Sequence, residues 1–145
     1  MSEACEFPTV NSDKEEIKEI FETVKTIAVV GLSPDAGKDS HMVAKYLQEH
    51  GYTIVPVYPK EDTILGEKVY RSLKEIPFAV DMVDMFRKPA AMDAIVDAAI
   101  ERGDVKVFWS QKGIVNNAAA KKARDAGMQV VQSHCTMVEH RVLFS

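Results

Sequence analysis

The amino-acid sequence predicts an α/β fold of three layers, in which helices cover both faces of a five-stranded, mainly parallel sheet. Short runs that are apolar throughout alternate along the chain with longer segments whose apolar residues recur at helical spacing. Glycine follows three of the predicted helices, at Gly51, Gly103 and Gly127, where it can end them. The chain has 145 residues, which is enough for one ordinary domain and too few for two.

A first helix is predicted to begin near Ser12, because Ser12 and Glu15 have the spacing of a capping box. The apolar residues that follow at helical intervals are Ile17, Ile20, Phe21 and Val24. We therefore expect residues 1–23 to form an N-terminal extension with a helix, ahead of a domain that covers residues 24–145.

Five strands are predicted from runs that are apolar on both faces, as parallel strands are when helices cover each side of the sheet. These runs are residues 26–31, 52–58, 81–86, 105–109 and 128–131. Pro56 falls inside the second run, where proline is poorly tolerated, so the end of that strand is loosely defined.

Three further helices are predicted, over about residues 40–50, 89–102 and 116–126. Strands that alternate with helices wind into a parallel sheet through right-handed crossovers, which is the arrangement of a Rossmann-like fold. We interpret the methionines in these apolar segments as core filling rather than as a binding surface. They are Met42, Met82, Met85 and Met92.

A ligand of such a fold is expected at the carboxyl ends of the strands. The loops expected there are residues 32–39, 58–66, 86–89, 110–116 and 132–140. The first loop lacks the dinucleotide pattern G-x-G-x-x-G, because Ser33 occupies the position of the second glycine. It also lacks the P-loop pattern, since Asp39 follows Lys38 where a serine or threonine is needed. Its glycine, hydroxyls and lysine can still hold a pyrophosphate at a helix N-terminus, and a plain turn is the alternative.

The second loop begins with Tyr58-Pro59-Lys60. Proteins that bind NAD place an acidic residue at this point to bind the free ribose hydroxyl. A lysine suits a phosphate on the ribose instead, which indicates NADP or coenzyme A. The alternative is an ordinary solvated lysine that pairs with Glu61 or Asp62.

A series of short motifs, in chain order, resembles the single-domain CoA-binding proteins related to the N-terminal domain of the succinyl-CoA synthetase alpha subunit. The motifs are Gly31-Leu-Ser-Pro34 with Lys38 and Ser40, Pro59-Lys60, residues 64–70, residues 86–89, residues 109–113, and Cys135 through His140. The resemblance covers residues 24–140 and implies a Rossmann-like site for coenzyme A. The cofactor-binding residues that it implies are Gly31, Ser33, Pro34, Lys38, Ser40, Tyr58, Pro59, Lys60, Phe86, Arg87, Gln111, Gly113 and Cys135.

By position in that family, the first loop would hold the pyrophosphate, and Pro59-Lys60 the adenosine with its 3′-phosphate. Phe86 and Arg87 would lie beside the adenine, and residues 110–113 beside the pantetheine. The sequence departs from the family where Tyr58 replaces the usual asparagine, and where Ser133-His134 replaces Asp-Arg before the cysteine. The second domain of the synthetase, with its phosphorylated histidine, is not expected, so the resemblance implies no ligase reaction.

The favoured function is a CoA-binding protein that is non-catalytic or regulatory, with CoA or acyl-CoA as its small-molecule partner. No nucleophile, base and orienting acid can be assembled from the sequence, and the cluster His134-Cys135 with Glu139-His140 lacks the spacing of a secure metal site. An NADP-dependent reductase or redox sensor, and an interaction module that partners a separate acyl-CoA enzyme chain, remain alternatives. The sequence leaves open whether the protein forms a homodimer or binds a protein partner.

Composition excludes several classes of protein and predicts where in the cell this one is found. A net charge of −4 gives no basic footprint for nucleic acid, and no apolar run approaches the length that spans a bilayer. The N-terminus has no basic segment followed by an apolar core, and the two cysteines, Cys5 and Cys135, make no disulfide framework. We therefore expect a cytoplasmic protein. Cys135 is interpreted either as a small buried residue or as a thiol that forms a mixed disulfide with CoA.

Overall fold

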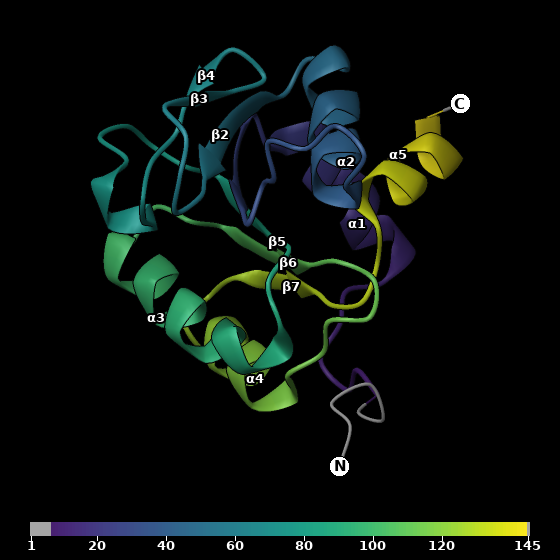
Figure 1. Cartoon of the computed structure of the whole chain (residues 1–145). Coiled ribbons are helices and arrows are strands. Elements are labelled where there is room, and N and C mark those ends of the chain that lie inside the picture. The colour runs from purple at the N-terminus through teal and green to yellow at the C-terminus, as the bar shows by residue number, and fades with distance from the viewer. Residues whose placement is uncertain (1–6, 145) are drawn as a thin grey trace.

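The computed structural model describes residues 7–144 as a parallel five-stranded sheet between two layers of helices (Figure 1). The strand order is β2-β1-β5-β6-β7, and every neighbouring pair is parallel. The strands are β1 (Thr26–Val30), β2 (Thr53–Val57), β5 (Met82–Met85), β6 (Val107–Ser110) and β7 (Gln129–Val131). The predicted fold class is confirmed. Cys5 lies outside the described residues.

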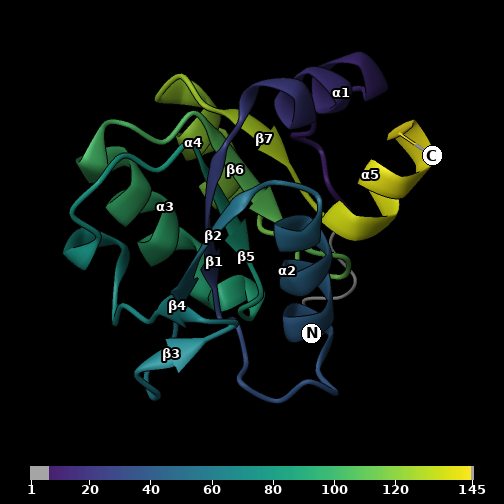
Figure 2. The same ribbon diagram turned by 90° about the horizontal axis from the view of Figure 1, so that it is seen from above.

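Helices cover both faces of this sheet, with α1, α2 and α5 on one side and α3 and α4 on the other (Figure 2). The helices are α1 (Lys14–Thr23), α2 (Asp39–Glu49), α3 (Met92–Arg102), α4 (Asn117–Asp125) and α5 (Thr136–Phe144). A small antiparallel hairpin, β3 (Thr63–Ile64) and β4 (Glu67–Lys68), follows β2. Two short 3₁₀ turns, η2 (Leu73–Glu75) and η3 (Pro89–Ala91), precede β5 and α3.

The core has two parts because successive residues of each strand point to opposite faces of the sheet. Ile27 and Val29 of β1 pack into the cluster under α1, α2 and α5, whereas Ala28 and Val30 pack into the cluster under α3 and α4. Of the four methionines predicted as core, Met82, Met85 and Met92 are fully buried. The prediction is wrong for Met42 of α2, which is 48% exposed.

The first helix begins one residue later than predicted. Asp13, not Ser12, is the N-cap, and it forms a capping box with Glu16. The hydroxyl of Ser12 instead donates to the backbone carbonyl of Val130, 2.8 Å away, and so ties the start of the chain to β7. Ser12 with Glu15 and Asp13 with Glu16 have the same spacing of three residues. Because Ser12 is bonded to β7, Asp13 serves as the cap.

The last predicted loop, residues 132–140, is wrong in its second half. The chain turns into α5 at Thr136, and this helix packs against α1 and α2. His140 on α5 is almost fully buried, and its Nδ1 lies 2.9 Å from the hydroxyl of Tyr46 on α2. Burial, and then the nearby His50, lower the pKa of His140, so the neutral ring is favoured there.

Pro56 is accommodated because β2 is the outermost strand of the sheet. It pairs with Val29 on one side, and on the other side its carbonyl accepts a hydrogen bond from the backbone N–H of Tyr70 at 3.0 Å. Proline has no N–H group to donate to a neighbouring strand, and on an edge strand no hydrogen bond of the sheet requires one.

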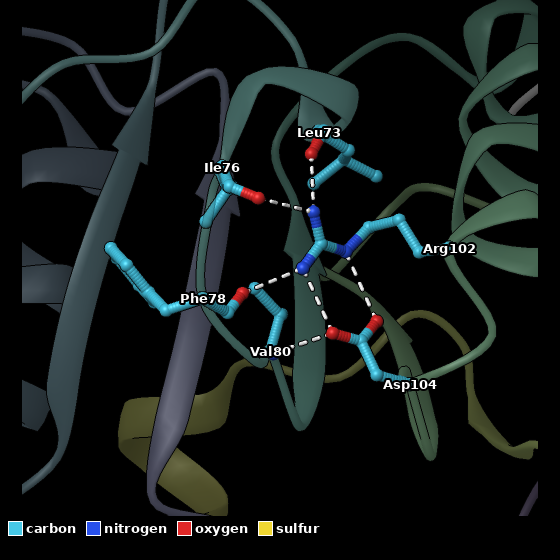
Figure 3. Close-up of polar contacts among 6 residues, drawn as sticks. All are labelled: Leu73, Ile76, Phe78, Val80, Arg102 and Asp104. Atoms are coloured by element: carbon cyan, nitrogen blue, oxygen red, sulfur yellow. Dashed lines mark hydrogen bonds and ion pairs between the residues drawn. The ribbon is translucent and has the colours of Figure 1, made fainter.

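Arg102, at the end of α3, fixes the segment that leads into β5 (Figure 3). One guanidinium nitrogen donates to the carbonyls of Leu73 and Ile76 at 2.7 and 2.9 Å, and another donates to that of Phe78 at 2.7 Å. The same group forms a two-pronged pair with Asp104, with distances of 3.0 and 2.8 Å. This cluster lies at the amino ends of β5 and β6. The predicted ligand loops lie at the other end of the strands, the carboxyl end.

Candidate functional site

A cleft of about 580 Å³ opens at the carboxyl ends of β1, β2 and β5. The chain runs outward from β1 to β2 and then returns to β5 on the other side of β1, so the cleft lies at the point where the strand order reverses. Its lining residues are Gly31, Ser33, Lys38, Asp39, Ser40, Tyr58, Pro59, Phe86 and Arg87. All of them except Asp39 are among the predicted site residues.

The loop after β1 is held by hydrogen bonds within itself. The N–H of Ser33 donates to the hydroxyl of Ser40 at 3.0 Å, and the N–H of Asp35 donates to the hydroxyl of Ser33 at 3.1 Å. The N–H of Gly37 donates to the carboxylate of Asp35 at 2.9 Å. Ser40 is nearly buried, so its hydroxyl shapes the loop at the same time as it lines the cleft.

The loop leads directly into the N-terminus of α2. Lys38 is the N-cap residue, and no side chain among residues 7–144 caps this helix, in contrast to α1 and α4. Lys38, Asp39 and Ser40 at this end of the helix line the cleft, and the first N–H groups of the helix have no intrahelical acceptor. Such an end attracts anions through its N–H groups and through the helix dipole.

Arg71 braces the loop after β2, and sequence reasoning missed it. Its guanidinium donates to the carbonyls of Tyr58, Lys60 and Glu61 at distances of 3.1, 2.9 and 2.9 Å. Glu61 has a positive φ of 71°, which this bracing helps to hold. No periodic pattern surrounds Arg71 in the sequence, so nothing there signalled its role.

A second cavity of about 340 Å³ adjoins the cleft, and the two share Asp39 and Phe86 in their walls. It lies between α2, α5 and the loop after β6. Its lining residues are Asp39, Met42, Val43, Phe86, Gln111, Lys112, Ile114, Cys135, Met137 and Val138. Gln111 and Cys135 were predicted, whereas Met137 and Val138 were missed because α5 was taken as a loop.

A buried polar cluster underlies this cavity. Asp84 of β5 and Thr136 of α5 are fully buried, and Gln111 is 5% exposed. The amide nitrogen of Gln111 donates to the Asp84 carboxylate and, at 3.1 Å, to the hydroxyl of Thr136. That hydroxyl in turn donates to the second carboxylate oxygen of Asp84 at 3.2 Å. Burial raises the pKa of Asp84 to about 7, although both hydrogen bonds oppose the rise.

Three predicted site residues line neither the cleft nor the cavity. Pro34 and Lys60 are exposed on the loops around the cleft, and Gly113 donates its N–H to the hydroxyl of Ser133 at 3.0 Å. Within residues 7–144, no group of three or more histidine, cysteine or acidic side chains is arranged to hold a metal ion. None of the helices in that range combines the length and the apolar character that a membrane span requires.

Known proteins resemble this chain in sequence and in fold. Residues 25–141 match the family model described as a CoA binding domain. The chain belongs to the CoA-binding domain family. Over 132 residues it is 42% identical to the uncharacterized protein YneT of Bacillus subtilis (strain 168), covering 91% of this chain and 97% of that protein.

The relationship extends to solved structures and to larger enzymes. A hypothetical protein from Pyrococcus horikoshii OT3 superposes with a TM-score of 0.89 at 41% identity, and the match covers 100% of both chains. The alpha subunit of an ADP-forming acetate–CoA ligase of Pyrococcus furiosus is 41% identical over 63 residues, which are 43% of this chain and 14% of that subunit. The family resemblance predicted from the sequence is confirmed.

Proposed function

We propose that this member of the CoA-binding domain family holds coenzyme A along the cleft and the adjoining cavity. The nucleotide occupies the cleft and the pantetheine arm occupies the cavity. The observation that carries the proposal is that the two hollows share Asp39 and Phe86, so one elongated ligand can occupy both. CoA has this form, since a charged nucleotide is joined to a long, largely apolar arm.

The charges of the cleft suit the nucleotide end. Lys38 and Arg87 line it beside the uncapped N-terminus of α2, and both side chains can bind phosphate oxygens. Asp39 also lines the cleft, and its carboxylate would repel a phosphate. We therefore assign the pyrophosphate to the side of Lys38 and Arg87. Lys60 is exposed on the rim and is assigned to the 3′-phosphate.

The cavity suits the pantetheine arm. Its walls are mostly apolar, with Met42, Val43, Met137 and Val138 on α2 and α5, and Gln111 adds one amide. An arm of methylene groups interrupted by amides fits such a lining, because apolar walls bury the methylenes and a polar group fixes their register. The 48% exposure of Met42 is then explained as part of a binding surface.

We also propose that Cys135 links the protein to thiol chemistry. Cys135 is half-buried in the cavity wall, and we assign the CoA thiol to this end of the cavity. Its thiolate can attack CoA disulfide, so that a protein–CoA disulfide forms, one S–S bond breaks and a CoA thiolate leaves. The role is then to store CoA or to respond to its oxidation, without turnover of a substrate. The cytoplasm, where thiols are kept reduced, is the proposed location.

Isothermal titration calorimetry with CoA, dephospho-CoA and NADP tests the proposal. CoA is expected to bind at one site per chain, with dephospho-CoA weaker because it lacks the phosphate assigned to Lys60. NADP carries its ribose phosphate on the 2′ oxygen instead of the 3′ oxygen and has no pantetheine arm, so it should bind more weakly than CoA. Tighter binding of NADP than of CoA would favour the reductase or redox-sensor alternative. No binding of CoA would overturn the proposal.

A further inference from the structure

We infer that Asp84 and Thr136 fix the side-chain amide of Gln111 so that its carbonyl oxygen, and not its NH₂ group, faces the cavity. Asp84 is thereby a positioning residue that makes this point of the wall a hydrogen-bond acceptor. The inference rests on the proposed function in one respect: the donor that meets Gln111 is an amide N–H of the pantetheine arm.

The hydrogen bonds account for every donor of the Gln111 amide. An NH₂ group has two hydrogens, and here one goes to the Asp84 carboxylate and the other to the Thr136 hydroxyl. The carbonyl oxygen, Oε1, has no protein partner within residues 7–144. In that part of the chain every fully buried side-chain nitrogen or oxygen does have a partner. Oε1 must therefore reach the accessible surface, which at Gln111 is the cavity wall.

Above the pKa of Asp84, where its carboxylate is ionised, the same cluster excludes the opposite orientation of the amide. An ionised carboxylate only accepts hydrogen bonds, so a flipped Gln111 would set its Oε1 against an Asp84 oxygen. The Thr136 hydroxyl has its single hydrogen on Asp84 and therefore also presents a lone pair to Gln111. All three residues are at least nine-tenths buried, so water cannot relieve the repulsion that a flip would create.

It matters for a ligand with several amides whether Gln111 presents an acceptor or a donor to the cavity. Each amide of the pantetheine arm offers an N–H donor and a carbonyl acceptor. An acceptor at Gln111 selects the register in which an N–H faces it, whereas an NH₂ group would select a carbonyl. Asp84 therefore helps to decide how far along the cavity the arm extends, and so where its thiol lies relative to Cys135.

The test compares two ligands, CoA and adenosine 3′-phosphate 5′-diphosphate, which lacks the pantetheine arm, by calorimetry at pH 8. Gln111→Met keeps the length of the side chain and removes the acceptor. It should weaken CoA by about 2- to 13-fold, the value of one neutral hydrogen bond, and leave the nucleotide unchanged. Asp84→Asn should also weaken CoA only, because an asparagine can face the Gln111 amide in either orientation.

The double variant distinguishes positioning from a merely structural role. If Asp84 acts through Gln111, then Asp84→Asn combined with Gln111→Met weakens CoA no more than Gln111→Met alone. Additive losses, or an Asp84→Asn variant that is folded and binds CoA as the wild type does, would overturn the inference. Thr136→Val, which leaves Asp84 as the acceptor, is the matched control and should weaken CoA less than Asp84→Asn.

Nuclear magnetic resonance of the wild type gives a second readout that needs no ligand and no folded variant. Both NH₂ protons of Gln111 should show contacts to Thr136 and slow exchange with water. Rapid exchange of that NH₂ group, as expected if it faced the cavity, would contradict the inference. Failure of the wild type to bind either ligand would instead remove the proposed function and leave the orientation of Gln111 to this measurement.

Discussion

Gly31 and Phe86 approach so closely that a Cβ atom on Gly31 would lie 2.9 Å from the carbonyl oxygen of Phe86. The φ angle of Gly31 is +89°, in a region that other residues rarely adopt. The N–H of Gly31 donates to the carbonyl of Val57, and the N–H of Phe86 donates to that of Val30. Gly31 is thus required by the packing of the loops after β1 and β5, before any ligand binds.

Gly31→Ala should therefore lower the free energy of unfolding more than a glycine substitution that meets no atoms. Gly51 is the matched control, because its φ is +96° and no atom of residues 7–144 lies within 4 Å of a Cβ placed there. We expect Gly51→Ala to cost about 1–2 kcal/mol for the strained backbone. Gly31→Ala should cost about 1–3 kcal/mol more for the overlap with Phe86. Denaturant unfolding measures both, and equal losses would contradict the close approach.

Lys60→Ala should weaken CoA more than dephospho-CoA, because only CoA carries the 3′-phosphate. A charge-assisted hydrogen bond contributes roughly 1.5–3 kcal/mol, or about 10- to 150-fold in affinity. Lys38→Ala, at the start of α2, should weaken both ligands, because both contain the pyrophosphate. Calorimetry with both ligands compares the two variants. Equal losses for Lys60→Ala would remove Lys60 from the 3′-phosphate site.

Cys135 should form a reducible adduct with CoA. After incubation with CoA disulfide, the intact mass of the wild type and of Cys5→Ser should increase by one CoA and return to its original value with dithiothreitol. The mass of Cys135→Ser should not change, because that variant lacks the thiol in the cavity wall. An adduct that persists in Cys135→Ser, or no adduct in the wild type, would refute the redox proposal and leave CoA binding itself untouched.

The stability of the wild type relative to Asp84→Asn should depend on pH. The pKa of Asp84 is raised in the folded protein from 3.8 to about 7, chiefly by burial. The folded state therefore holds the proton more tightly than the unfolded state, and stability is lost as pH rises from about 4 to about 7. The full loss is of the order of 4 kcal/mol, from about three pH units at 1.36 kcal/mol each.

Denaturant unfolding of both proteins at pH 4.5, 6 and 8 measures this difference. His140, whose pKa burial lowers, titrates in both proteins, so its contribution cancels. The wild type should lose stability relative to Asp84→Asn at each step. A difference that stays constant across the three pH values would mean that Asp84 does not titrate in this range.

The parts of the fold that the sequence predicted are those with strong periodicity. Buried strands such as Thr26–Val30 and most ends of the helices closed by glycine were found within a residue or two. The helix predicted over residues 89–102 begins three residues later, because residues 89–91 form the 3₁₀ turn η3 ahead of α3. Helix α5 was missed because its apolar residues, Met137, Val138, Val142, Leu143 and Phe144, do not fall on one face. The β3–β4 hairpin was missed because two residues per strand are too few to show alternation.

The site residues also divide into those that local sequence predicted and those that it did not. Residues on motifs directly after β1, β2 and β5 line the cleft, because topology alone brings those loops together. Arg71 and Asp84 were not predicted as site residues, since their roles come from contacts with segments far away in the chain. Asp84 meets Thr136 across 52 positions of sequence, and no local pattern indicates that pairing.

The central claim is that one CoA molecule occupies both the cleft and the cavity. The most direct measurement is a nuclear magnetic resonance titration that follows the backbone amides, other than the prolines, of residues 31–41, 58–60, 111–114 and 135–138. Adenosine 3′-phosphate 5′-diphosphate should shift the signals of the first two segments only. CoA should shift the signals of all four, because its arm also enters the cavity lined by Gln111 and Cys135. Identical shifts from the two ligands, or shifts confined to other parts of the chain, would contradict the claim.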